Sequence, residues 1–136
     1  MYPIKLSSLF LFCALAGNAQ LAVTVSPAKI IGQKAVVQLC MTNYFAASVV
    51  SARAVCFVVD EQGKMVGQST KWVIGGTKDR PALQAKSGTT FNFVVTNPRQ
   101  FTTTNLVAKV SFSRVVMDGH RLANVAEDVR VLTAEK

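Results

Sequence analysis

The chain has 136 residues, of which 50% are hydrophobic, and its formal net charge is +8 at pH 7. This length supports one domain with a hydrophobic core and excludes two domains of ordinary size. The basic excess favours anionic partners, although basic residues dispersed along a chain also serve solubility alone.

The first residues have the pattern of a secretory signal peptide. Lys5 provides the positive flank, residues 6–16 form an apolar stretch, and Gly17 and Ala19 are small residues suited to a cleavage site. We therefore predict a signal peptide over residues 1–19 and a mature domain over residues 20–136, located in the periplasm or outside the cell. The apolar stretch is shorter than the roughly 20 residues of a spanning helix, so no transmembrane segment is expected after cleavage.

From Leu21 onward, short runs of β-branched and aromatic residues alternate with turn residues, and no helical period is sustained. The predicted strands lie in runs 21–30, 34–43, 49–60, 64–74, 89–97, 104–117 and 121–132. About seven strands in a chain of this length are typical of an immunoglobulin-like sandwich. The predicted fold is therefore all-β, an immunoglobulin-like antiparallel β-sandwich.

Two cysteines remain after the predicted cleavage, Cys40 and Cys56. An exported chain could join them, because disulfides form outside the cytoplasm. Alternation along the strands argues against this bond, since it turns Cys40 outward and Cys56 inward. We therefore expect Cys56 to be an inert core thiol.

Polar residues predict two hairpin turns. Asp60 opens a polar step that contains Gly63, and this pattern joins the strands on either side as a hairpin rather than forming a catalytic carboxylate pair. Asp118 and Gly119 predict a second hairpin between the last two long strands. The single histidine, His120, follows this turn and is expected to be exposed.

The longest irregular segment, residues 75–88, carries paired glycines and a proline, and it is the natural place for a binding loop. Pro27, Pro81 and Pro98 all fall at predicted strand ends or in loops, where proline interrupts no central ladder.

The sequence contains no residue pattern that is typical of a catalytic or metal site. Glu127 and Asp128 are neighbours on a predicted strand, so they would point to opposite faces and form no carboxylate pair. Nucleophilic catalysis would depend on His120 alone, and the spacing of the cysteines and histidine fits no zinc site. We therefore predict a non-enzymatic protein without a metal or other cofactor.

The chain resembles small bacterial extracytoplasmic immunoglobulin-like domains, and loosely the FxLYD group among them. The resemblance lies in residues 57–67, which include the Asp60 turn, and in residues 83–95. In this pattern a strand ends in Asp and turns through Gly, and a later Leu, Gly and Phe open another strand. Cys56, Val58 and Val59 replace the motif's Phe, Leu and Tyr, so only Asp60 agrees. The resemblance implies a fold and an interaction role, and it transfers no catalytic residue.

A candidate ligand-binding segment surrounds the only tryptophan, Trp72. An aromatic ring with nearby cations suits a sugar ring or an acidic chain. The alternative is that Trp72 is a buried packing anchor, as sandwiches commonly have. The predicted ligand-binding residues are Lys71, Trp72, Lys78, Arg80 and Lys86.

A candidate interface lies on the strand that precedes Asp60. Val55, Phe57 and Val59 would form its outward face, and an uncovered apolar face marks an interaction surface. The run 21–30 could instead offer an open sheet edge to a partner, or it could pair within its own domain.

These patterns favour an exported, non-enzymatic sandwich that acts through protein-protein or assembly contacts in the cell envelope. The alternative function is a binding module for an acidic glycan or another anionic envelope ligand. Nucleic acid is not an expected partner outside the cytoplasm.

Overall fold

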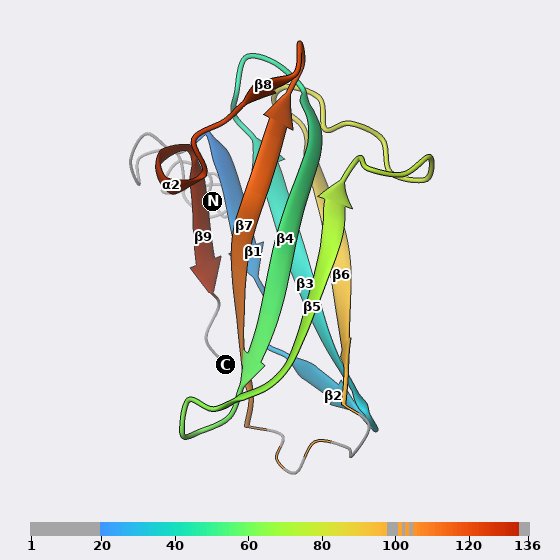
Figure 1. The fold of residues 1–136 in the computed structure, drawn as a ribbon, viewed down its shortest axis with the longest axis vertical. Helices are drawn as coiled ribbons and strands as arrows, with labels where there is room; N and C mark the ends of the chain where they lie inside the picture. Colours follow the sequence, from blue (N-terminus) through green and yellow to red (C-terminus); the bar gives the residue numbers. More distant parts are fainter. Residues whose placement is uncertain (1–19, 98–100, 102, 104, 134–136) are drawn as a thin grey trace, which may run out of the picture.

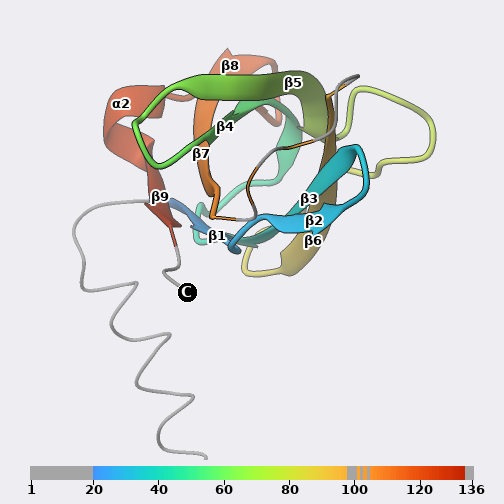
Figure 2. The same ribbon diagram turned by 90° about the horizontal axis from the view of Figure 1, so that it is seen from below.

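The structure, a computed structural model, describes residues 20–97, 101, 103 and 105–133. Its strands form two sheets that pack face to face, and the two layers are separated clearly in the view along the strands (Figures 1 and 2). The predicted all-β sandwich is confirmed. The predicted signal peptide, residues 1–19, lies outside the described residues, and no helix in the described part is long and apolar enough to cross a membrane.

One layer is a five-stranded sheet centred on β3. On one side β3 pairs with β6 along almost its whole length, and on the other side it pairs with β2 and then with β1. β1 also pairs with β9, and this pair is parallel. The strands of this sheet are β1 (Leu21–Val25), β2 (Lys29–Ile31), β3 (Lys34–Asn43), β6 (Gly88–Thr96) and β9 (Val129–Thr133).

The other layer is a four-stranded sheet in the order β5, β4, β7, β8. β4 is central and pairs antiparallel with both β5 and β7, with bulges near Arg53 on both sides. The outer strand β8 pairs only with the last residues of β7. The strands of this sheet are β4 (Val49–Val59), β5 (Met65–Ile74), β7 (Val107–Met117) and β8 (Arg121–Leu122).

Alternation along the strands builds the core between the sheets. In β3 every second residue from Ala35 to Asn43 is buried, while Gln38 and Cys40 on the other face are exposed. Full burial of an aliphatic or aromatic side chain stabilises the fold by about 1.5–3 kcal/mol. The largest fully buried side chains are Phe93, Leu21, Leu39, Met41, Ile74 and Leu106.

The turn after β4 is held by the carboxylate of Asp60. Its Oδ1 accepts hydrogen bonds from the backbone N–H groups of Gln62 and Lys64, each at 2.9 Å. Gly63 has a φ of 81°, which a glycine adopts without steric cost. The predicted β4–β5 hairpin is confirmed, and Asp60 serves the turn.

Residues 75–87 connect β5 to β6 across the end of the sandwich, as the sequence predicts, and extend well beyond the sheets (Figure 1). A bridge between Val49 and Leu83 ties this loop to β4. The Asn43 amide donates to the carbonyls of Leu83 and Ala47, each at 3.0 Å, and its Oδ1 accepts from the Phe45 N–H at 2.8 Å. Asn43 is the only buried polar residue among the described residues.

The two ends of the described chain depart from the predicted strands. The run 21–30 divides into β1 and β2 around Pro27, and β1 lies between β3 and β9, so it is not an open edge. Of the two alternatives for this run, the structure has the second: it pairs within its own domain and not with a partner. The last run divides further, and the described residues contain nine strands rather than about seven.

The predicted strand over residues 121–132 is wrong in its middle. Only Arg121 and Leu122 continue the Asp118–Gly119 turn as a strand, so the predicted second hairpin has one very short arm. A helical turn, α2 (Val125–Asp128), follows because the Asn124 side chain accepts hydrogen bonds from the N–H groups of its first turn. Glu127 and Asp128 therefore lie on this helix rather than on a strand.

The two cysteines are free thiols on different faces, as alternation predicts. Cys40 is exposed on the outer face of the five-stranded sheet, and Cys56 is buried between the sheets. Burial raises the pKa of the Cys56 thiol to about 11. This thiol is therefore protonated and unreactive at neutral pH.

Candidate functional site

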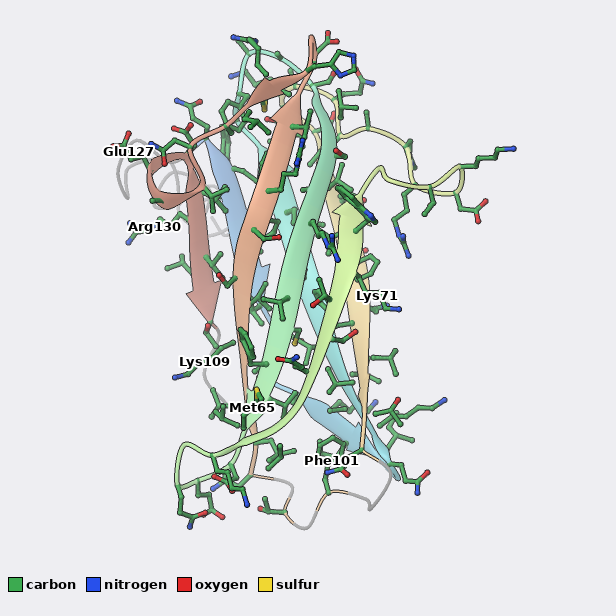
Figure 3. The ribbon with its side chains drawn as sticks, in the orientation of Figure 1. Met65, Lys71, Phe101, Lys109, Glu127 and Arg130 are labelled. Atoms are coloured by element: carbon green, nitrogen blue, oxygen red, sulfur yellow. The ribbon has the colours of Figure 1, made fainter. Side chains whose placement is uncertain are left out.

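The predicted ligand-binding residues Lys71 and Trp72 are neighbours on β5, and they point to opposite sides of it. Trp72 is opposite Arg53 on the outward face of the four-stranded sheet. Lys71 is opposite the inward-facing Ala54, and its side chain leaves β5 on the side of β6 (Figure 3). Adjacent strand residues alternate in direction, so these two cannot share one ligand surface.

The remaining predicted ligand residues are dispersed along the loop after β5. The guanidinium of Arg80 lies over the Phe91 ring, 4.9 Å from its centroid, in the wall of a cavity of about 360 Å³. Lys86 donates from its Nζ to the Tyr44 carbonyl at 3.2 Å. Lys78 is exposed on the loop. The structure therefore brings no two of the predicted basic residues together around Trp72.

Trp72 is half-buried rather than fully buried. On one side its ring meets the guanidinium of Arg53, 5.8 Å from the ring centroid. On another side it lies close to Gly76, where an added Cβ would come within 2.4 Å of the indole. Gly76 therefore gives the loop room to pass over Trp72, whereas Gly75 lies against the backbone of Val50. The half-buried indole packs under the loop and still forms part of the surface.

The outward side chains of β4, β5 and β7 form a continuous surface, which we call the β4 face. Val55, Phe57 and Val59, the predicted interface residues, point outward on β4 and are half-buried. Val59 has Met65 on one side and Val107 on the other, and these remain 51% and 45% exposed. Met65 lies at the lower end of this sheet (Figure 3). This end of the β4 face is therefore apolar and accessible.

The other end of the β4 face is cationic. Arg53 is directly opposite Arg114 of β7 and opposite Trp72 of β5, so the three side chains form one cross-strand row. Both arginines are exposed. Among the described residues, no carboxylate forms an ion pair with either arginine. Like charges placed directly opposite each other on a sheet are destabilising, so this row leaves a positive potential unneutralised.

The outward face of the five-stranded sheet is different in character. It presents mainly polar side chains, and it has an apolar patch of its own at Ile31, Val36 and Val94, of which Ile31 and Val94 are 56% and 44% exposed. Its exposed polar residues include Thr24, Gln38, Thr90 and Asn92. The combination of an accessible apolar cluster with an arginine pair therefore distinguishes the β4 face from the opposite face of the molecule.

The residues that could have served catalysis or metal binding are not brought together in the structure. His120 is exposed in the turn before β8, with a φ of 63°, and the Cys56 thiol is buried in the core. Within the described part of the chain, no group of three or more His, Cys, Asp or Glu side chains is placed to hold a metal ion.

Arg53 and Arg114 were not among the residues singled out in the sequence. Arg53 is the only charged residue in the largely apolar β4, and this is a signal that could have identified it; Arg114 lies in β7, which also contains Lys109 and two serines. Their proximity depends on the pairing of β4 with β7, which alternation within one strand does not reveal.

No protein-family model matches the sequence, and no curated protein matches it either. Solved structures do resemble the fold. The structural genomics target SoR45 is 12% identical with a TM-score of 0.52, over 78% of this chain and 80% of that chain. The putative ApaA protein from Bordetella pertussis is 13% identical with a TM-score of 0.55, over 79% and 87% of the two chains. At these identities the likeness shows the fold alone.

Proposed function

We propose that this protein is an exported, non-enzymatic β-sandwich module that binds a partner protein in the cell envelope through the β4 face. The observation that carries the proposal is the apolar end of this face, where Met65 and Val107 flank Val59 and remain 51% and 45% exposed. Accessible apolar clusters rimmed by polar residues are typical of protein-protein contacts.

The surrounding geometry supports this function over the acidic-glycan alternative. The glycan hypothesis needs the loop cations to gather around Trp72, whereas Lys71 points to the other side of β5 and Lys86 binds a backbone carbonyl. The export and envelope location rest on the signal-peptide pattern of residues 1–19. The immunoglobulin-like resemblance, with its interaction role, agrees with a binding module.

Site-specific photo-crosslinking tests the proposal. A photo-reactive side chain is placed at Met65 or at Val107 in the full chain, expressing cells are irradiated, and adducts are detected by immunoblotting. The matched control carries the same group at Gln38, which is exposed on the five-stranded sheet. We expect a discrete protein adduct of the same size from both positions on the β4 face. The absence of such an adduct, or the same adduct from Gln38, would contradict the proposal.

A further inference from the structure

The strands that form the β4 face carry basic but no acidic residues, and this charge favours an anionic partner. The four strands of its sheet contain no Asp or Glu, whereas they contain five basic residues. Three of them, Arg53, Lys109 and Arg114, lie on the outward side, and Lys109 is opposite Phe57. The other two, Lys71 and Arg121, are opposite the buried Ala54 and Met117. The described carboxylates of the molecule all lie in turns, in loops or on α2, so none of them neutralises the middle of the face.

The arginine pair is arranged to receive an anion. The Cζ atom of Arg53 lies 5.8 Å from the Trp72 ring centroid, within the range of a cation–π contact. A guanidinium that uses its flat side on a ring keeps its N–H edge free for a carboxylate. A carboxylate beside Arg53 and Arg114 would also relieve the repulsion between two cations that are opposite each other on paired strands.

The apolar cluster and the arginine pair lie along one strand. Val59, Phe57, Val55 and Arg53 follow one another on the outward side of β4, two residues apart. Two residues of a strand span about 6.6 Å, so the ends of this series are about 20 Å apart. An extended peptide of about six or seven residues covers that distance.

We propose, on the basis of the function proposed above, that the β4 face binds an acidic segment of a partner protein that is apolar at one end. Its carboxylates contact Arg53 and Arg114, and its apolar side chains pack on Phe57, Val59, Met65 and Val107. The specificity of the contact then comes from charge at one end and from apolar burial at the other.

Charge complementarity separates this occupant from two others. A second copy of this chain would place the cationic row either against itself, where like-charge contacts cost several kcal/mol, or against the apolar end, where the arginines would be buried without a carboxylate. The chain's own residues 1–19 contain no Asp or Glu, so they offer nothing to the arginines.

Binding of defined peptides tests the proposal. The probe is a fluorescent peptide of about ten residues, long enough to cover the face, with valines in one half and glutamates in the other. Its counterpart carries lysines in place of the glutamates. Fluorescence anisotropy measures the binding of each peptide to the protein purified after expression of the full chain, at about 0.05 M and about 0.5 M salt. We expect the glutamate peptide to bind at least about tenfold more tightly than the lysine peptide at the lower salt.

Charge variants locate the contact. Arg53→Glu combined with Arg114→Glu should weaken binding of the glutamate peptide by about tenfold or more, since two attractive contacts become repulsive. The milder pair Arg53→Gln and Arg114→Gln guards against misfolding, which circular dichroism monitors. The matched control is Arg130→Glu, because Arg130 is an exposed strand arginine on the five-stranded sheet. This control should leave binding unchanged.

The outcomes separate the two proposals. Equal binding of the glutamate and lysine peptides, or equal weakening by Arg130→Glu, would overturn the acidic-segment proposal. Tighter charge-dependent binding to heparin or to phosphatidylglycerol vesicles than to the peptide would overturn it too, by identifying an acidic glycan or a lipid surface as the occupant. If the photo-adducts at Met65 and Val107 form nonetheless, the proposed binding function stands; if they do not form, that function fails.

Discussion

Asn43 joins the end of β3 to the loop that follows β5, because its amide nitrogen lies 3.0 Å from the carbonyl oxygen of Leu83. The same amide donates to Ala47, and its oxygen accepts from Phe45, so one side chain satisfies three backbone groups. The long loop is therefore fixed at its middle, close to the bridge between Leu83 and Val49.

Replacing this amide should destabilise the fold in a way that depends on charge. Asn43→Ala removes three hydrogen bonds, although the Leu83 carbonyl still accepts from the Val49 N–H. The loss should lower the free energy of unfolding by about 1–3 kcal/mol. Asn43→Asp has the same shape but directs a carboxylate oxygen at two carbonyl oxygens, so it should cost more at neutral pH. Urea denaturation of both variants measures the difference. Equal losses would show that the amide donors contribute little.

Gly76 should tolerate alanine less well than Gly63. The two glycines have nearly the same φ, 80° and 81°, so alanine meets a similar backbone penalty of about 1–2 kcal/mol at both. At Gly76 an added Cβ would also meet the Trp72 ring at 2.4 Å, whereas nothing lies within 4 Å at Gly63. We expect Gly76→Ala to cost about 1–3 kcal/mol more, the range of overpacking.

Fluorescence of the single tryptophan checks the mechanism behind this difference. Gly76→Ala should displace the indole and shift the emission of Trp72, while Gly63→Ala should leave the spectrum unchanged. A normal spectrum combined with a large loss of stability in Gly76→Ala would mean that the loop moves instead of the ring.

The two thiols should differ in reactivity in the folded protein. Cys40 is exposed and Cys56 is buried. Brief alkylation with iodoacetamide in mildly alkaline buffer, followed by peptide mapping, should therefore modify Cys40 and leave Cys56 intact until the chain unfolds. Labelling in urea provides the control, since both sites should then react. Rapid native labelling of Cys56 would contradict its place in the core.

The buried Cys56 thiol should make stability fall in alkaline solution. Its pKa is raised from 9.0 to about 11, so between these values the folded state keeps a proton that the unfolded chain has lost. The free energy of unfolding therefore decreases as the pH rises through this interval, by roughly 3 kcal/mol in total, and is unaffected by this group below it. Comparing urea denaturation of the wild type and Cys56→Ala at several pH values isolates the contribution. Parallel curves would refute it.

Much of the fold follows from local patterns. The run 34–43 coincides with β3, because apolar residues recur at every second position from Ala35 to Met41 and both of its ends carry polar residues. The Asp60 turn was equally predictable, since an Asp followed by a Gly three positions later defines a local structure.

The end of the chain was less predictable for two reasons. Asn124 followed by Glu127 is a helix-start signal, but the valines around it fit a strand equally well, and the side-chain cap decides between them. The parallel pairing of β1 with β9 is a contact between distant segments, and no pattern within either strand encodes it.

The candidate surface was predicted in part. The outward direction of Val55, Phe57 and Val59 follows from alternation in β4. The same rule applied to Lys71 and Trp72 would have separated them, since neighbours on a strand point apart. The row that joins Arg53, Trp72 and Arg114 depends on the register of three strands, including bulges, and only the folded structure provides that register.

The pairing of β1 with β9 also constrains how the protein can be made. β1 starts at Leu21 and its parallel partner ends at Thr133, so the five-stranded sheet is incomplete until nearly the whole chain has been synthesised. Contacts between such distant segments form slowly, because a long loop must close before they stabilise anything. In a nascent chain, the β1–β9 pair of the five-stranded sheet therefore cannot form before β9 has left the ribosome.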